Sequence, residues 1–254
     1  MRGTLIICPD AESVSREAAE RFVSAAAEKL SDQRATFAVA LAGGSTPRRL
    51  YELLAGSPYR SKIPWARVHF FWGDERLVPL DHADSNFRMA HEALLRHVPV
   101  QPVNLHPIPT NLPADQAAQA YERTLRAHFG RWGLPKFDLV LLGVGADGHT
   151  ASLFPGSAAL AEKDHLVMPH SRGVNQPARV TLTLPVFNNA SHIHFLVTGK
   201  PKASALRAAL ERGTLPVQRV QPKKGELLFL VDAAAAGKLD GVRIEVPVTS
   251  EAEP

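Results

Sequence analysis

Cysteine is nearly absent from this chain, with Cys8 the single one among 254 residues. One thiol cannot form an internal disulfide, so the sequence predicts a fold without disulfides in a reducing, cytoplasmic location. Cys8 lies in a short apolar segment, where a small buried residue is a better interpretation than a nucleophile. Long apolar runs are missing too, since none approaches the roughly 18 residues that a membrane-spanning helix requires. We therefore expect neither a signal peptide nor a membrane partner.

Clusters of one charge sign are also missing. Lys and Arg number 29 against 25 Asp and Glu, which gives a formal net charge of +4. The basic residues are scattered or paired, as in Arg48-Arg49, whereas proteins that bind nucleic acid gather them in a patch or stripe. We expect no nucleic-acid partner, and a mild positive charge suits a small anionic substrate. The composition, with 45% hydrophobic and 21% charged residues, excludes a disordered or fibrous chain.

Short apolar segments alternate with helical patterns along the whole chain. The predicted strands are Leu5–Cys8, Thr36–Leu41, Val68–Trp72, Phe137–Gly143, Ile193–Thr198 and Leu227–Asp232. The predicted helices are Glu12–Leu30, Pro47–Ala55, Asn86–His97, Asp115–Phe129 and Lys202–Arg212. Strands without polar alternation are typical of parallel sheets covered on both faces. The pattern predicts one α/β domain over residues 1–254, with a mostly parallel, doubly wound sheet and helices on both faces.

Three loops that follow predicted strands carry unusual residues, and ligands in open α/β sheets bind where strands end. In the first loop, Gly43 and Gly44 let the backbone approach an anion closely. Ser45 and Thr46 supply hydroxyl groups at the start of a helix, whose free N–H groups favour negative charge. The loop lacks the lysine of a Walker A motif, so nucleotide hydrolysis is not expected. A plain helix cap explains the same residues equally well.

The second loop contains three consecutive charged residues, Asp74, Glu75 and Arg76, after a predicted strand. Such a run is usually a solvated loop. Here it lies between two apolar segments, so it is expected to be held in place. Arg76 can then present its guanidinium to a phosphate or a carboxylate in a bidentate arrangement.

The third loop, Gly143–Thr150, contains a formal G-x-G-x-x-G pattern after the most hydrophobic strand. A dinucleotide site is disfavoured, because the loop lies in mid-chain and no acidic partner for a ribose follows at the expected place. A general base fits better. Histidine side chains are largely neutral at pH 7 and can take a proton from water, which makes His149 a candidate base. Asp147, two residues earlier, can orient its imidazole. A structural histidine is the alternative.

Other candidates carry weaker signals. His192 and His194 are two residues apart on a predicted strand, but the sequence offers no third ligand for a metal site. Arg179 begins a further apolar segment and could face the cleft. Lys202 follows another predicted strand and could reach a bound phosphate, although a surface lysine is the simpler interpretation.

Taken in order, these segments resemble the 6-phosphogluconolactonase family, the hydrolases of the second step of the pentose phosphate pathway. The matching segments are Leu41–Pro47 (LAGGSTP), Phe71–Arg76 (FWGDER), Asp84–Asn86, Phe137–Gly156, Arg179–Leu184 (RVTLTL) and Val197–Ala203 (VTGKPKA). The resemblance implies a fold similar to those of glucosamine-6-phosphate deaminases and ribose-5-phosphate isomerases. It also implies hydrolysis of 6-phospho-D-glucono-1,5-lactone without a metal or an organic cofactor. The oligomeric state stays open, and a monomer is compatible.

The resemblance assigns roles to several of these positions. The histidine of the D-G-H motif, His149 here, corresponds to the general base that activates water, and Asp147 supports it. Arg76 corresponds to a residue that contacts the substrate or its phosphate. The remaining anion-binding positions implied are Gly43, Gly44, Ser45, Thr46, Arg179 and Lys202.

Two alternatives share this scaffold. The related glucosamine-6-phosphate deaminases resemble this chain around D-G-H, but place a glutamate five residues after the histidine for ring-opening chemistry. Here that position is Phe154, which favours the lactonase. The second alternative is a non-catalytic sugar-phosphate sensor, a class that carries a helix-turn-helix segment. We expect none, because the first predicted strand begins almost at residue 1.

Overall fold

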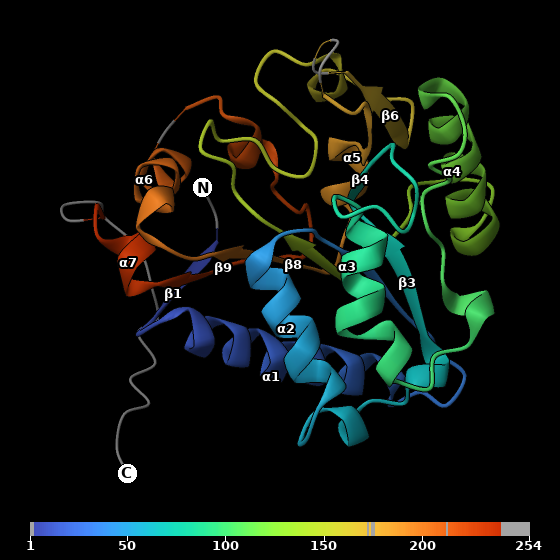
Figure 1. Cartoon of the computed structure of the whole chain (residues 1–254), viewed down its shortest axis with the longest axis horizontal. Helices are drawn as coiled ribbons and strands as arrows, with labels where there is room; N and C mark the ends of the chain where they lie inside the picture. Colours follow the sequence, from blue (N-terminus) through green and yellow to red (C-terminus); the bar gives the residue numbers. More distant parts are fainter. Residues whose placement is uncertain (1–2, 172, 174–175, 212, 240–254) are drawn as a thin grey trace.

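A six-stranded parallel sheet forms the centre of the protein (Figure 1). The computed structural model describes residues 3–171, 173, 176–211 and 213–239. The strand order is β1-β9-β8-β5-β2-β3. The strands are β1 (Thr4–Cys8), β2 (Phe37–Leu41), β3 (Val68–Trp72), β5 (Leu139–Leu142), β8 (His192–Val197) and β9 (Glu226–Asp232). All six lie where the sequence predicted strands, within one or two residues at each end.

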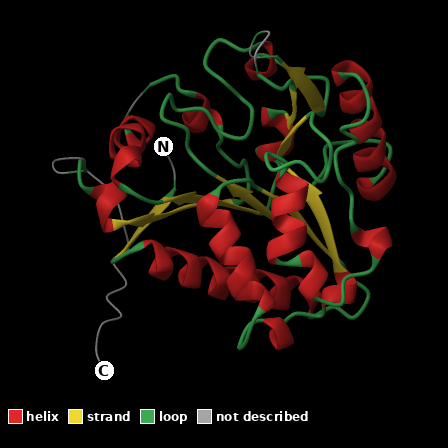
Figure 2. Cartoon of the chain, in the orientation of Figure 1, coloured by secondary structure: helices red, strands yellow, loops and turns green. Residues whose placement is uncertain are grey.

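Helices cover both faces of this sheet (Figure 2). They are α1 (Ala11–Leu30), α2 (Ser45–Ala55), α3 (Asn86–Ala93), α4 (Ala114–Phe129), α5 (Leu184–Phe187), α6 (Ala203–Leu210) and α7 (Ala233–Ala236). Neighbouring residues of β3 show the two layers, since side chains alternate between faces. Phe70 stacks on Trp65, which packs against Phe22 of α1, whereas Phe71 packs against Phe129 of α4. The predicted α/β fold with helices on both faces is confirmed.

A second, three-stranded antiparallel sheet was not predicted. Its order is β4-β7-β6, from β4 (Asp74–Arg76), β7 (Arg179–Leu182) and β6 (Val167–His170). The usual interpretation of Asp74–Arg76 as a solvated loop is therefore wrong. Asp74 is 7% exposed and Glu75 1%. Charged residues are seldom buried unless partners meet them, and those partners come from distant segments.

Other predicted boundaries shift slightly. The third helix ends at Ala93 and continues as a 3₁₀ turn over Leu95–His97. Lys202 ends a 3₁₀ turn, and α6 begins at Ala203; its predicted end at Arg212 lies outside the described residues. The other 3₁₀ turns are Arg60–Lys62, Trp65–Arg67, Pro102–Asn104, Ala158–Leu160 and Pro216–Arg219. Whether the domain spans all of residues 1–254 stays a prediction.

The strand order creates a switch point between β2 and β5. From β2 the chain moves outward to β3, whereas from β5 it moves the other way, to β8 and then β9. The connections that leave β2 and β5 therefore diverge, which opens a crevice beyond the carboxyl ends of these neighbouring strands. The glycine-rich loops at 42–44 and 143–149 both begin at this crevice.

None of the helices in the described ranges is long and apolar enough to span a bilayer.

Candidate active site

A cavity of about 350 Å³ lies at the carboxyl ends of β2, β5 and β8. Most of the residues that the sequence selected line it: Gly43, Gly44, Ser45, Thr46, Arg76, His149, Arg179 and Lys202. Asp147 is the exception, because it contacts His149 without lining the cavity itself. Three loops, one helix N-terminus and the small antiparallel sheet thus meet at one place. This convergence could not be read from the sequence, although each loop could.

The two glycines of the first loop are required by its shape. Gly44 has φ of 110°, in a region that other residues rarely adopt, and it is the N-cap of α2. At Gly43 an added Cβ would overlap the side-chain oxygen of Asn86. The first intrahelical hydrogen bond runs from the Arg48 N–H to the Gly44 carbonyl. Ser45 and Thr46, the first two residues of α2, line the cavity. Their N–H groups precede that first bond, so they have no acceptor within the helix and form its positive end.

The loop after β8 is tied to the same helix. The hydroxyl groups of Thr46 and Thr198 lie 2.7 Å apart. The Gly199 N–H donates to both carboxylate oxygens of Asp232, at 3.0 and 2.9 Å. Asp232 is 5% exposed and also accepts from the N–H of Ala235 at the start of α7. This buried carboxylate, which the sequence did not single out, fixes the loop that leads to the cavity-lining Lys202.

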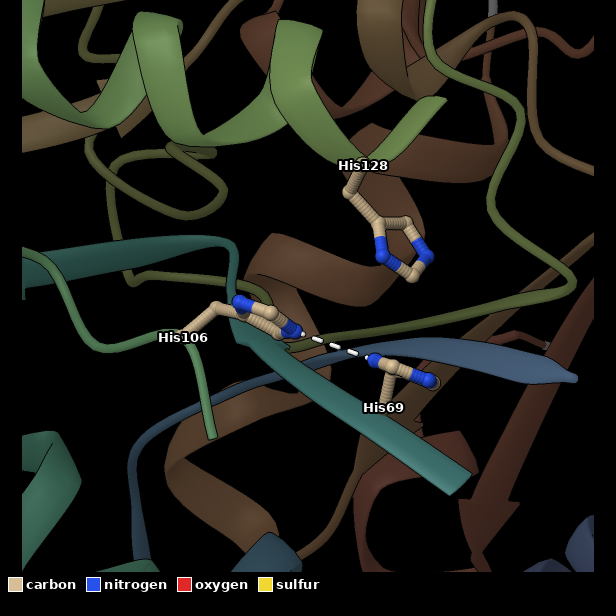
Figure 3. Close-up of side chains that lie close together, drawn as sticks. All are labelled: His69, His106 and His128. Carbon is tan, nitrogen blue, oxygen red and sulfur yellow. Dashed lines mark hydrogen bonds between the residues drawn. The ribbon is translucent and has the colours of Figure 1, made fainter. Parts of the chain in front are cut away.

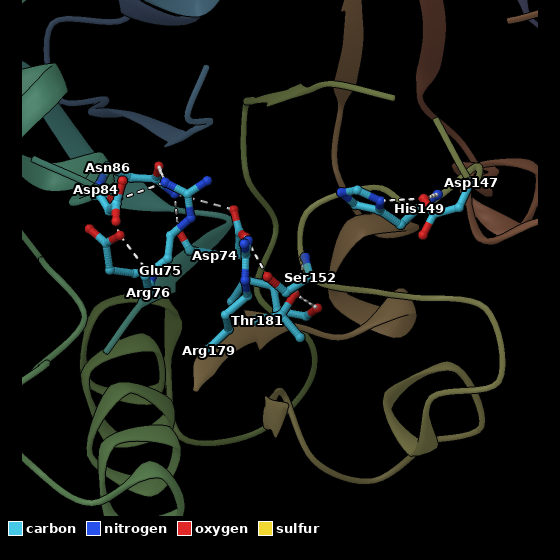
Figure 4. A network of polar contacts seen from close by, with 11 residues as sticks. Asp74, Glu75, Arg76, Asp84, Asn86, Asp147, His149, Ser152, Arg179 and Thr181 are labelled. Atoms are coloured by element: carbon cyan, nitrogen blue, oxygen red, sulfur yellow. Dashed lines mark hydrogen bonds and ion pairs between the residues drawn. The ribbon is translucent and has the colours of Figure 1, made fainter. Parts of the chain in front are cut away.

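Two arginines enter the cavity from the antiparallel sheet (Figure 4). Arg76 donates through NH1 to the Asp84 carbonyl at 2.7 Å and to the Asn86 side-chain oxygen at 3.3 Å. Its buried Nε has no hydrogen-bond partner in the described part of the chain, so a donor remains for a ligand. Arg179 forms an ion pair with Asp74 at 3.8 Å and lies 5.7 Å from the centre of the Phe154 ring.

Glu75 anchors the segment that holds Arg76. Its carboxylate accepts backbone N–H groups from Arg76, Asn86 and Phe87, each at 2.8 Å, at the N-terminus of α3. It also accepts from the Ser85 hydroxyl at 3.1 Å. Burial raises the pKa of Glu75 above its usual value, although these hydrogen bonds oppose the shift. The role is one of support, because Glu75 satisfies buried donors rather than lining the cavity.

Asp74 links the small sheet to α3 and to the loop at Ser152. Its backbone carbonyl accepts from the Asn86 amide at 2.9 Å, and its carboxylate accepts from the Ser152 hydroxyl at 2.5 Å. The backbone N–H of Ser152 in turn donates to the hydroxyl oxygen of Thr181 at 3.3 Å. Asp74 and Asn86 both line the cavity and were missed as site residues. Their signal was present, because both lie in segments that carry the family resemblance.

The third loop presents a histidine with its carboxylate partner. Gly148 has φ of 79° and donates its N–H to the Gly145 carbonyl at 3.0 Å, which closes a tight turn. The turn brings Asp147 and His149 together, with 2.5 Å between the carboxylate oxygen and Nδ1. Desolvation alone would raise the pKa of Asp147, but the hydrogen bonds from His149 outweigh it and lower that pKa. Figure 4 shows the pair set apart from the arginines.

Gly145 allows the imidazole to lie against the loop backbone, which gives a prediction. An added Cβ at Gly145 would overlap Nδ1 of His149, so Gly145→Ala must displace the ring from Asp147. We expect kcat to fall by at least about tenfold while the free energy of unfolding changes little. Gly56→Ala is the matched control, since its Cβ would meet only ordinary contacts far along α2. Normal turnover by Gly145→Ala would mean that the ring position does not matter.

Phe154 closes the site beside the histidine. Its ring lies 4.3 Å from the His149 ring and stacks on His170 at 4.8 Å. The position at which the resemblance places a glutamate in the deaminases is thus an aromatic ring packed on the imidazole. The arrangement offers one acid–base pair, two arginines and a helix N-terminus around one cavity. It can bind a small anion at one end and transfer a proton at the other.

The other candidate groups, Cys8, His192 and His194, do not line the cavity. Cys8 is buried, and burial raises the pKa of its thiol. His194 is 2% exposed, and burial lowers its pKa to about 3. His192 contacts the Asp138 carbonyl through Nδ1 at 3.0 Å. Within the described ranges, no third ligand joins these two strand histidines.

Comparisons with known proteins show which proteins this chain is similar to. The family model described as glucosamine-6-phosphate isomerases/6-phosphogluconolactonase matches residues 9–229. The 6-phosphogluconolactonase of Synechocystis is 43% identical over 214 residues, covering 82% of this chain and 86% of that protein. The solved structure of 6-phosphogluconolactonase from Trypanosoma brucei superposes with a TM-score of 0.81 at 31% identity, covering 94% and 99% of the two chains.

A monomeric glucosamine-6-phosphate deaminase superposes with a TM-score of 0.78 at 20% identity, covering 92% and 99% of the two chains. At that identity the likeness concerns the fold alone. It explains why the fold does not separate the two chemistries. The matched length and the identities show that this chain belongs to the glucosamine-6-phosphate isomerase/6-phosphogluconolactonase family.

Proposed function

We propose that this protein hydrolyses 6-phospho-D-glucono-1,5-lactone to 6-phospho-D-gluconate, with His149 as the general base. The observation that carries the proposal is that His149, which is held by Asp147, lines the same cavity as Arg76, Arg179 and the N-terminus of α2. A sugar phosphate lactone needs both halves: an anion site for its phosphate and a base for the attacking water. The matching relatives named as 6-phosphogluconolactonases support the same substrate.

In the neutral imidazole, the contact with Asp147 decides which ring nitrogen of His149 carries the proton. A lowered pKa keeps Asp147 ionised at pH 7, and an ionised carboxylate can only accept hydrogen bonds. The proton between them therefore belongs to Nδ1 of His149, which leaves the lone pair of Nε2 available. Nε2 is the atom that takes a proton from water, and Asp147 stabilises the imidazolium that results.

The reaction then balances with one histidine. Water adds to the carbonyl carbon of the lactone while His149 Nε2 removes its proton, and the carbonyl oxygen becomes an oxyanion. The intermediate collapses, the bond between this carbon and the ring oxygen breaks, and His149 returns the proton to that oxygen, which becomes the 5-hydroxyl group. The acid formed then loses its proton to solvent. A base of this kind contributes about 10²–10⁴-fold, and orientation supplies the rest.

The phosphate lies, in this proposal, against Arg76, Arg179, Lys202 and the start of α2. The two arginines supply charged N–H donors, and the helix N-terminus adds partial positive charge. Ser45 and Thr46 offer hydroxyl donors beside the same N–H groups. A small molecule is the only partner proposed. The cytoplasmic location and the absence of a nucleic-acid partner remain predictions from composition.

The residues around His149, the proposed general base, support the deaminase alternative less well. Ring opening of an amino sugar uses a further acid–base group, which the resemblance places five residues after the histidine. Phe154 fills that position and packs its ring on His149, so a carboxylate is missing where the reaction needs one. Hydrolysis needs no such group, because the histidine that removes the proton can also return it.

A coupled assay tests the proposal. Glucose-6-phosphate dehydrogenase generates the lactone in the cuvette, and 6-phosphogluconate dehydrogenase reports the product as NADPH. We expect the second NADPH to form well above the rate of spontaneous hydrolysis, in proportion to the protein added. A rate equal to the spontaneous one, from folded protein, would overturn the proposal. Release of ammonia from glucosamine 6-phosphate by the same preparation would favour the deaminase.

A further inference from the structure

Three histidines from distant parts of the chain meet at the edge of the large sheet (Figure 3). His69 lies on the edge strand β3, His106 in the loop before α4, and His128 in the last turn of α4. One ring nitrogen from each lies within 4.8 Å of the others. Nδ1 of His69 and Nε2 of His106 are already 3.1 Å apart. None of the three lines the active-site cavity.

The backbone holds these rings in place. The His106 N–H donates to the Phe70 carbonyl at 2.9 Å, and Leu105 forms a parallel bridge with Phe70. The segment before α4 therefore runs along β3 as a short extension of the sheet. The His106 ring stacks on Phe71 at 4.3 Å, and the His128 ring packs on the edge of the same phenylalanine at 5.1 Å. Rings supported in this way need little reorganisation to bind a ligand.

The three imidazoles are also accessible to a ligand from solvent. All three rings are half-buried rather than enclosed, which leaves room for a metal-bound water.

We propose that His69, His106 and His128 bind one divalent transition-metal ion, zinc in the first place. Three imidazole nitrogens with an open fourth position form a ligand set that Zn²⁺ accepts in tetrahedral geometry. With Zn–N bonds of about 2.0–2.1 Å, the nitrogens of such a site lie roughly 3.3 Å apart. The pair His69–His106 is near this spacing, so movement of the third ring by on the order of 1 Å completes it.

The bound ion would act as a structural clamp. It would join the edge strand, the loop between residues 98 and 113, and the C-terminal turn of α4, in addition to the hydrogen bonds to the strand backbone that already connect the loop and α4 to this strand. Because the histidines lie outside the cavity, the proposal does not depend on the lactonase chemistry. An ion that binds the folded state alone raises its stability in proportion to the logarithm of the metal concentration.

Cobalt and zinc titrations test the site. Tag-free protein, dialysed against a chelator and then against metal-free buffer, is titrated with Co²⁺ at pH 7. We expect one equivalent to give the intense visible absorption of tetrahedral Co²⁺, and one equivalent of Zn²⁺ to abolish it. Saturating Zn²⁺ should raise the midpoint of thermal unfolding by on the order of 5 °C.

Three variants locate the ion. His106→Gln and His128→Gln remove a ligand from different segments, and each should weaken binding at least about 100-fold. His192→Gln is the matched control, because it changes another half-buried histidine of the same sheet that has only one histidine beside it. Circular dichroism establishes that each variant is folded. The absence of saturable binding, equal binding by both cluster variants and the parent, or loss of binding in His192→Gln would each overturn the proposal.

Discussion

Replacing His149 with glutamine is expected to lower kcat for the phosphorylated lactone by about 10²–10⁴-fold. Glutamine keeps polarity and similar length but cannot take a proton from water at neutral pH. KM should change little, because the proposed phosphate contacts come from Arg76, Arg179 and α2, which line another part of the cavity. The measurement is a steady-state coupled assay with the spontaneous rate subtracted, beside circular dichroism of the variant.

His165→Gln is the matched control for this experiment. The His165 side chain is 66% exposed and its ring lies 3.8 Å from Glu122, outside the cavity. Its removal should leave kcat unchanged within experimental error. Turnover by His149→Gln above a tenth of the parent rate would remove His149 from the role of base. The proposed lactonase activity could still stand in that case, with another group activating the water.

The loop Gly143–Thr150 could be singled out from the sequence because its residues are consecutive, whereas the direct contact between Asp147 and His149 could not be read from it. A tight turn at Gly148 suffices to bring Asp147 and His149 together, and the residues that do so are consecutive. The parallel sheet was predictable for a similar reason, since unbroken apolar segments are a property of each strand alone. The predicted positions of the loops then followed from the general rule that ligands bind where parallel strands end.

The supporting carboxylates could not be found in this way. Asp74 and Glu75 look like a solvated charged pair in the sequence, yet each is buried by partners that lie elsewhere along the chain. Glu75 meets the N-terminus of α3, and Asp74 meets Ser152 and Arg179. Whether a charge is buried depends on those partners, and a single sequence does not show which segments will meet.

The histidine cluster shows the same limit more strongly. His192 and His194 drew attention as metal ligands because they are two residues apart, yet the structure gathers no third ligand beside them within the ranges that it describes. His69, His106 and His128 are separated by 37 and 22 positions, and the sequence gives them no common pattern. The fold brings them together because β3 is the edge strand and α4 returns across it. Spacing along the chain is a poor guide to ligands that come from different elements.

Removing the charge of Arg76 should separate phosphate recognition from hydrolysis. We expect Arg76→Met to lower kcat/KM for the phosphorylated lactone by about 10–150-fold, since a hydrogen bond to a charged group contributes roughly 1.5–3 kcal/mol. Activity on unphosphorylated glucono-1,5-lactone should fall no more than about threefold, because that substrate makes no phosphate contact. Both substrates are measured with the same protein preparation. The phosphorylated lactone is followed by the coupled assay, and the unphosphorylated lactone by the release of acid.

Arg88→Met is the matched control, because Arg88 lies in the first turn of α3, its side chain is 40% exposed, and it does not line the cavity. It donates to the Asp81 carbonyl at 2.9 Å and pairs with Glu92, so its loss also disturbs the segment before α3. Arg76 holds that segment through the Asp84 carbonyl, and a purely structural effect would therefore reduce the rates on both lactones alike. Equal loss on the two substrates in Arg76→Met would place Arg76 among the supporting residues, with the phosphate bound by Arg179, Lys202 and the start of α2. A loss confined to the phosphorylated lactone, with Arg88→Met unchanged on both, would mean that the guanidinium of Arg76 binds the phosphate.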